Sequence, residues 1–140
     1  MIAYVDSSVI LRVVLGQPDA LEEWGDLEAG ATSALAEVEC LRTLDRLRLR
    51  TGLGGDAMAL RREAVFRVLD SLTVVELDRP VLTRAAQPMP TLLGTLDAIH
   101  LASALLWAER EAYPPAFATH DRALALAARG FGLRVLGAPA

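Results

Sequence analysis

Lysine is absent from the 140-residue sequence, and cysteine occurs once, at Cys40. Without lysine, the chain lacks the cation that a phosphate-accepting receiver domain places beside its phosphate, which argues against that class. A single cysteine excludes an internal disulfide and a zinc site made of cysteine thiolates. The expected role of Cys40 is therefore buried packing.

Long apolar runs are also missing, although 53% of the residues are hydrophobic and the mean hydropathy is +0.33. No run approaches the roughly 18 apolar residues of a membrane span, and no basic segment precedes Asp6, so neither a transmembrane helix nor a signal peptide is expected. We therefore expect a cytoplasmic protein with one domain, residues 1–140. Its apolar surplus over the usual composition is interpreted as a subunit interface, most simply that of a homodimer.

Short apolar strands alternate with helical patterns along the chain. The expected strands cover residues 2–5, 30–33, 72–77, 116–119 and 133–136, and the expected helices cover residues 9–14, 18–28, 34–50, 56–70, 79–87, 97–111 and 122–129. Pro18 is assigned to the first turn of its helix, and Gly130 is expected to end the last one. The alternation predicts an α/β fold with a mostly parallel sheet of four to five strands covered on both faces.

Four carboxylates far apart in the sequence are predicted to meet at one edge of this sheet. Asp6 and Asp121 each follow a strand and precede a helix, while Asp97 opens a helix that runs antiparallel to the next strand. Glu39 lies early in the helix that follows the second strand, with Glu37 as the competing candidate on another side of that helix. Ligands of open α/β sheets bind at the carboxyl edge of the strands, which predicts a functional site there.

Each of these residues also has a purely structural interpretation. An aspartate at a helix start caps free N–H groups, and a glutamate on a surface helix is often a solvated charge. The apolar neighbours of Asp6 and Asp97 favour a shared site instead. Converging carboxylates repel one another, and a hard divalent cation, Mg²⁺ or Mn²⁺, would relieve that repulsion. Such a site is suited to hydrolysis of a phosphodiester.

Two other residue types bear on this hypothesis. His100 is expected to be a packed helix residue, and His120 is expected to lie beside the site. The net charge is −4, yet arginines gather on two successive helices and would form either a basic rim for a phosphodiester or merely a solvated face. These arginines are Arg42, Arg46, Arg48, Arg50, Arg61, Arg62 and Arg67. A haloacid-dehalogenase-like phosphatase is disfavoured, because Ser8 stands where that class has its second aspartate.

Four segments in order resemble the motifs of PIN-domain proteins, and the resemblance covers essentially the whole chain. Residues 4–9 resemble the opening of the family, and residues 32–42 resemble the segment that carries its glutamate. Residues 96–102 resemble the third motif, and residues 117–122 resemble the fourth, with His120 at a variable position. Length and motif spacing are similar to those of VapC toxins from bacterial toxin–antitoxin pairs.

The resemblance implies a three-layer α/β/α sandwich and a role for each matching residue. Asp6 and Asp97 would bind the metal directly, and Asp121 would bind it directly or through water. Glu39 would position a water on the metal or a second ion. Ser7 and Thr119 would support the carboxylates by hydrogen bonds. Independently of the resemblance, Arg42 and Arg46 of the arginine cluster are the candidates for contact with RNA.

The implied function is that of an Mg²⁺- or Mn²⁺-dependent endoribonuclease that cuts tRNA or ribosomal RNA. VapC proteins usually form homodimers, and a cognate antitoxin protein covers the cleft and restrains the activity. The alternative is a non-catalytic binding or interaction module that keeps the same fold.

Overall fold

The computed structural model describes residues 1–139, and within them five strands form one sheet in the order β3-β2-β1-β4-β5, with every neighbouring pair parallel. The strands are β1 (Ile2–Val5), β2 (Ala29–Ser33), β3 (Thr73–Val75), β4 (Ala116–Ala118) and β5 (Val135–Leu136). The α-helices are α1 (Ser7–Val14), α2 (Leu35–Thr51), α3 (Gly55–Asp70), α4 (Arg79–Ala85), α5 (Thr95–Ala108) and α6 (Arg122–Gly130). The predicted parallel sheet is confirmed.

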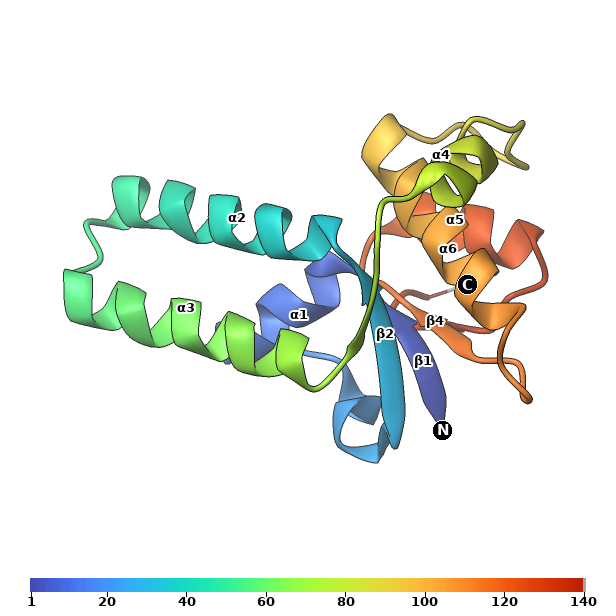
Figure 1. The fold of residues 1–140 in the computed structure, drawn as a ribbon. Coiled ribbons are helices and arrows are strands. Elements are labelled where there is room, and N and C mark those ends of the chain that lie inside the picture. Colours follow the sequence, from blue (N-terminus) through green and yellow to red (C-terminus); the bar gives the residue numbers. More distant parts are fainter. Residues whose placement is uncertain (140) are drawn as a thin grey trace.

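Alternating side chains of the central strands build a core on each face of the sheet. Ala3 and Val5 of β1 belong to a buried cluster with residues of α1, α2 and α3. Tyr4 points to the opposite face, where it stacks on Phe117 of β4 with ring centroids 5.4 Å apart and packs with α5 and α6. Helices therefore cover both faces (Figure 1), and the expected α/β/α sandwich is confirmed.

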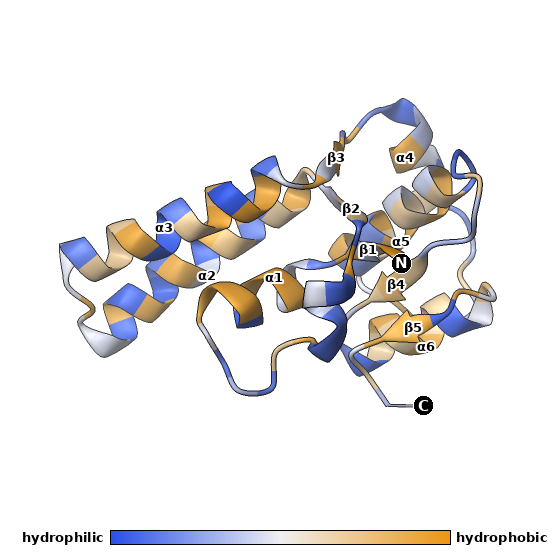
Figure 2. Ribbon diagram, turned by 90° about the horizontal axis from the view of Figure 1, so that it is seen from below, coloured by the Kyte–Doolittle hydropathy of each residue, from blue (hydrophilic) through white to orange (hydrophobic). Residues whose placement is uncertain are grey.

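Helices α2 and α3 pack against each other as a hairpin that extends away from the sheet (Figure 1). Apolar and polar residues alternate along both helices (Figure 2), and Leu44 and Val65 are fully buried. Gly52 ends α2 in the left-handed conformation, with φ 66°, and its N–H donates to the carbonyl of Arg48. Glycine adopts this conformation without the steric penalty of a Cβ atom.

The expected helix from Pro18 to Glu28 is wrong in extent and type. Only a short 3-10 helix, η1 (Glu22–Asp26), forms, and Pro18 lies in the turn before it. No side chain caps this helix, and Leu21 at its start is buried in the core. Packing of Leu21 therefore decides the path of this segment, rather than the helix-starting preference of proline.

Two other helix boundaries also differ from expectation. Gly130 is the last residue of α6, and the left-handed residue is Gly132, with φ 81°. A Cβ atom at Gly130 would lie 2.8 Å from the Pro90 side chain, so a close contact explains glycine there. Helix α5 begins at Thr95 after Gly94, which places Asp97 inside its first turn. None of the helices in residues 1–139 is long and apolar enough to cross a membrane.

Candidate active site

Asp6 lies at the carboxyl edge of the sheet, directly after β1, and is 5% exposed. Its Oδ1 accepts hydrogen bonds from the Ser8 hydroxyl at 2.6 Å and from the Val9 N–H at 3.2 Å, so it caps α1. Its Oδ2 accepts a hydrogen bond from the Thr119 hydroxyl at 2.6 Å, and Thr119 follows the neighbouring strand β4. The parallel pairing of β1 and β4 thus brings together residues 113 positions apart.

Burial governs the charge state of Asp6. Loss of solvent raises the pKa of this carboxyl above its ordinary value, and the hydrogen bonds from Ser8 and Thr119 offset only part of that effect. A buried carboxyl with a raised pKa resists ionisation unless a cation compensates its charge.

Asp97 and Asp121 approach the same edge from two helices. Asp121 caps α6 by accepting from the Leu124 N–H at 2.9 Å, and its own N–H donates to the Thr119 hydroxyl at 3.0 Å. Asp97 is half-buried in the first turn of α5. Burial raises the pKa of Asp97, and so do the negative charges of Asp121, Asp6 and, more weakly, Glu39. Asp97 therefore lies close enough to the other three predicted carboxylates for their charges to affect its ionisation.

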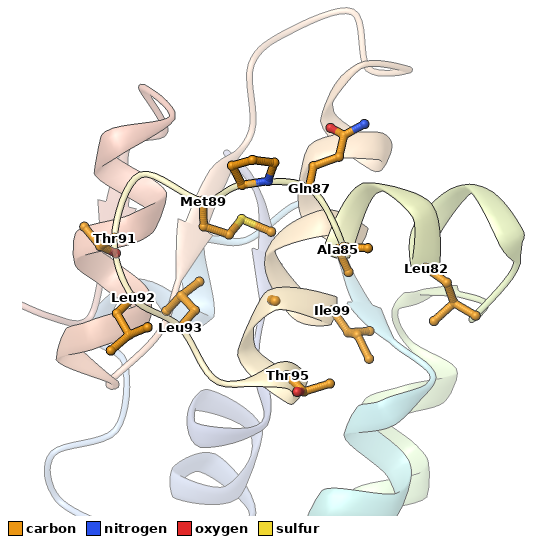
Figure 3. Close-up of a pocket in the computed structure, with 12 residues that line it drawn as sticks. Leu82, Ala85, Gln87, Met89, Thr91, Leu92, Leu93, Thr95 and Ile99 are labelled. Atoms are coloured by element: carbon orange, nitrogen blue, oxygen red, sulfur yellow. The ribbon is translucent and has the colours of Figure 1, made fainter.

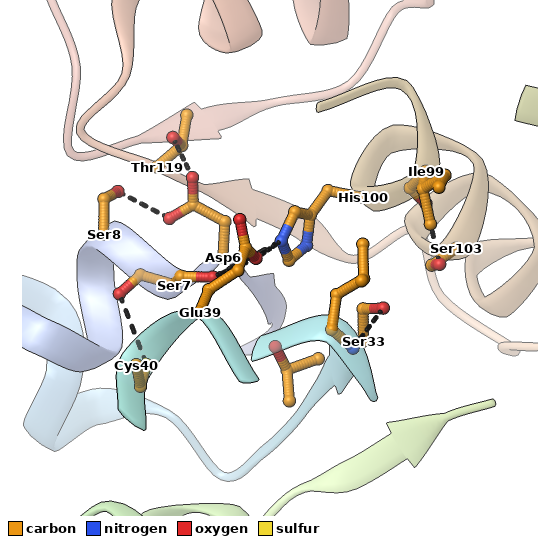
Figure 4. A network of polar contacts seen from close by, with 12 residues as sticks. Asp6, Ser7, Ser8, Ser33, Glu39, Cys40, Ile99, His100, Ser103 and Thr119 are labelled. Carbon is orange, nitrogen blue, oxygen red and sulfur yellow. Dashed lines mark hydrogen bonds and ion pairs between the residues drawn. The ribbon is translucent and has the colours of Figure 1, made fainter. Parts of the chain in front are cut away.

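Glu39 reaches this site from α2. Its Oε1 accepts hydrogen bonds from the Ser7 hydroxyl at 2.6 Å and from His100 Nε2 at 2.5 Å (Figure 4). Burial works against ionisation of Glu39, but the hydrogen bonds from His100 and Ser7 outweigh it and hold its pKa below the ordinary value. Glu37 is exposed on the same helix. The structure thus places Glu39, and not Glu37, at the sheet edge.

The donor set fits a hard divalent cation by charge and by atom type. Carboxylate oxygens are the ligands that Mg²⁺ prefers, and burial, which raises the pKa values of Asp6 and Asp97, favours a compensating positive charge there. Within residues 1–139, however, no three His, Cys, Asp or Glu side chains stand together as a ready-made coordination cluster. Both oxygens of Asp6 are held by hydrogen bonds, whereas Asp97 and Asp121 are less buried than Asp6.

Sequence reasoning undervalued His100. It is packed in α5, as expected, and only 2% exposed, but both ring nitrogens also belong to the polar network of the site (Figure 4). Its position three residues after Asp97 put both residues on one side of the helix, and that spacing was the available signal. His120 lies beside the site, where its backbone N–H donates to the Ser8 hydroxyl at 2.9 Å.

The arginines of α2 lie farther along that helix than Glu39. Arg42 is exposed and pairs with Asp45 at 3.0 Å, and Arg46 is exposed and donates to the Thr43 hydroxyl. Contact of Arg42 and Arg46 with RNA stays a prediction.

A large apolar pocket, of about 690 Å³, lies between α4, the following loop and the start of α5 (Figure 3). Ala98 and Ile99, next to Asp97 in the chain, form part of its wall, but none of the four carboxylates lines it. The pocket is therefore distinct from the acidic site. Its lining residues include Leu82, Met89 and Leu92.

A five-stranded parallel sheet with four carboxylates near its carboxyl edge is the architecture implied by the sequence resemblance. The family model described as PIN domain matches residues 3–129. The chain belongs to the PIN-domain family.

Two relatives place the chain more specifically, among the VapC-like members of the PIN-domain family. The chain is 32% identical over 136 residues to "Ribonuclease VapC47" of Mycobacterium tuberculosis, covering 92% of this chain and 91% of the relative. It is 36% identical over 104 residues to "Ribonuclease VapC46" of the same species, covering 72% of each. Both relatives carry the VapC name that the sequence motifs predicted.

Solved structures agree on the fold. VapBC2 from Rickettsia felis, crystallised with a DNA fragment from its promoter, aligns with a TM-score of 0.66 at 11% identity, over 96% of this chain and 97% of that one. A toxin–antitoxin complex from Klebsiella pneumoniae aligns with a TM-score of 0.63 at 16% identity, over 88% and 90%. At these identities the likeness supports the fold alone.

Proposed function

We propose that this protein is a VapC-type toxin, an endoribonuclease that hydrolyses phosphodiester bonds of RNA with the help of Mg²⁺ or Mn²⁺. The observation that carries the proposal is the gathering of Asp6, Glu39, Asp97 and Asp121 at one sheet edge in a chain related to two VapC ribonucleases. Transfer RNA and ribosomal RNA are the candidate substrates.

The carboxylates divide into two roles. Asp6 and Asp97 would hold the cation, and Asp121 would hold it directly or through water. When bound, such a cation would polarise a phosphoryl oxygen and lower the pKa of a nearby water. Glu39 is ionised at neutral pH because its pKa is lowered, and it orients the attacking water. Hydroxyl groups support both charges: Thr119 and Ser8 donate to Asp6, and Ser7 donates to Glu39 beside His100.

Arginines on α2 provide the contact with the RNA backbone. Arg42 and Arg46 are exposed on the helix that also carries Glu39. A guanidinium pairs with phosphate oxygens through two parallel hydrogen bonds, so these side chains suit a polyanionic substrate despite the negative net charge.

The protein has two further partners in this proposal. A cognate antitoxin covers the acidic cleft and restrains the nuclease, which is supported by the toxin–antitoxin assemblies among the solved relatives. A second copy of the chain covers part of the exposed apolar surface and forms a homodimer.

Two substitutions on one helix test the proposed nuclease. Glu39→Gln removes the charge that orients the water, and we expect RNA cleavage to fall by roughly 10²-fold or more. Glu37→Gln is the matched control, because Glu37 is exposed two residues away and contacts nothing in the site. Cleavage of a total RNA pool in Mg²⁺ is the measurement. Equal cleavage by the two variants would remove the assigned role of Glu39.

A further inference from the structure

The imidazole of His100 links two elements of the fold to Glu39. Nδ1 lies 2.8 Å from the Tyr4 hydroxyl of β1, and Nε2 lies 2.5 Å from Glu39 Oε1 of α2. The Ser7 hydroxyl, which also donates to Oε1, lies 3.4 Å from Nε2. His100 and Tyr4 are 2% and 1% exposed, so water does not compete for these contacts.

The chemistry of the partners fixes the position of one proton. An ionised carboxylate only accepts hydrogen bonds, so Nε2 must carry a proton to donate to Glu39 Oε1. A phenol is protonated at neutral pH, so the Tyr4 hydroxyl has a proton available for Nδ1. Tyr4 and Glu39 thus hold the ring from opposite sides in one orientation.

We propose that His100 is a positioning residue: Tyr4 fixes its ring, and the ring fixes Oε1 of Glu39. The assignment rests on the proposed ribonuclease function. Within residues 1–139, the hydrogen bonds that the Glu39 side chain accepts converge on Oε1. Oε2 accepts none of these hydrogen bonds, so it is the oxygen left for a water or substrate group.

Positioning by His100 matters because Glu39 would otherwise be a flexible side chain on a helix surface. Ordering a glutamate side chain costs conformational entropy. Two donors from α1 and α5 order it before substrate arrives, and pre-ordered groups lower the barrier of the reacting complex. His100 does not contact the substrate in this arrangement, so it acts through Glu39 alone.

Four variants separate this role from a merely structural one. His100→Leu removes the donor to Glu39, and we expect kcat for RNA cleavage to fall about 10–100-fold with KM nearly unchanged. His100→Gln restores an N–H donor and should recover part of kcat, while Tyr4→Phe should cause a smaller loss. Ser103→Ala is the control for loss of a buried polar group of α5, because Ser103 lies near Tyr4 and donates to the Ile99 carbonyl but makes no hydrogen bond to His100 or Glu39. Thermal unfolding of each variant confirms that it folds.

The outcomes distinguish this inference from the proposed function. If His100→Leu keeps the kcat of Ser103→Ala while wild type cuts RNA, the positioning role is overturned and the nuclease stands. If wild type cuts no RNA, the proposed function and the role built on it both fail.

A second measurement needs no activity. Nitrogen-15 NMR of the His100 ring in metal-free protein should show a proton on Nε2, and Glu39→Gln should shift the Nε2 resonance far more than Glu37→Gln does. A ring protonated on Nδ1 alone would overturn the inference.

Discussion

At the scale of single residues, Asp6 serves the fold and the site at once. It caps α1 through Oδ1, and the same carboxylate accepts hydrogen bonds from the hydroxyls of Ser8 and Thr119. The structural interpretation of these aspartates as caps is therefore correct for Asp6 and Asp121, and it does not compete with a functional one. Asp97 caps nothing, so its substitution disturbs the fold least.

Asp97 should make the metal-free protein less stable as the pH rises. Its folded-state pKa is raised by burial and by Asp121, so its contribution to stability is complete below the unfolded pKa of about 3.9 and is lost as the pH rises through the folded value. At pH 7 and in the presence of a chelator, we expect Asp97→Asn to unfold at a higher temperature than wild type. This difference in unfolding temperature should become smaller as the pH is lowered toward about 4.

Asp56→Asn is the control for that comparison. Asp56 is an exposed first-turn acid of α3, so its substitution removes the same favourable interaction with a helix N-terminus without touching the site. Mg²⁺ should raise the unfolding temperature of wild type and of Asp56→Asn. The rise should be much smaller for Asp97→Asn. A lower unfolding temperature of Asp97→Asn than of wild type at pH 7 in chelator would contradict the electrostatic account.

At the scale of elements, the sequence predicted strands and helices well where hydrophobic periodicity and turn chemistry agreed. The run before Asp6 and the glycines after Arg50 are such places. It failed where tertiary packing decided the outcome. Pro18 was outweighed by burial of Leu21, and Gly130 is set by the approach of Pro90, which lies 40 residues earlier.

In the site, the positions of the carboxylates could be predicted from the sequence, but the hydrogen bond between His100 and Glu39 could not. The carboxyl ends of parallel strands lie at one edge of the sheet. The order of strands and helices along the chain therefore predicts that four carboxylates lie at that edge: Asp6, Glu39, Asp97 and Asp121. The hydrogen bond between His100 and Glu39 depends on the directions of side chains on two separate helices, α5 and α2. Periodicity alone does not specify these directions.

The hairpin turn between α2 and α3 depends on the left-handed residue Gly52. We expect Gly52→Ala to lower the free energy of unfolding by about 1–2 kcal/mol, because a Cβ atom penalises this conformation. Gly55→Ala is the control, since it opens α3 with no atom within 4 Å of the added Cβ, and it should leave stability equal or higher. Denaturant titration measures both, and equal losses would contradict the assignment.

At the scale of the whole molecule, apolar side chains remain exposed around the α4–α5 pocket. Leu92 and Leu82 both line the pocket (Figure 3), and they are 96% and 38% exposed. A surface of this kind is typical of a protein interface. It offers the proposed second copy a place to bind.

Sedimentation at micromolar concentration tests the homodimer. We expect a species of twice the 15.0 kDa chain mass, and we expect Leu92→Glu to shift it toward the monomer. Leu49→Glu is the control, because Leu49 is 72% exposed near the tip of the α2–α3 hairpin. A wild type that sediments only at 15.0 kDa would rule out the dimer under these conditions.

The most direct test of the proposed function is cleavage of a total bacterial RNA pool by purified wild type, Asp97→Asn and Asp56→Asn, each in Mg²⁺, in Mn²⁺ and in chelator. We predict discrete fragments from wild type and Asp56→Asn, only with metal, and none from Asp97→Asn. Identical behaviour of wild type and Asp97→Asn, with or without metal, would contradict the nuclease and favour a PIN-fold binding module.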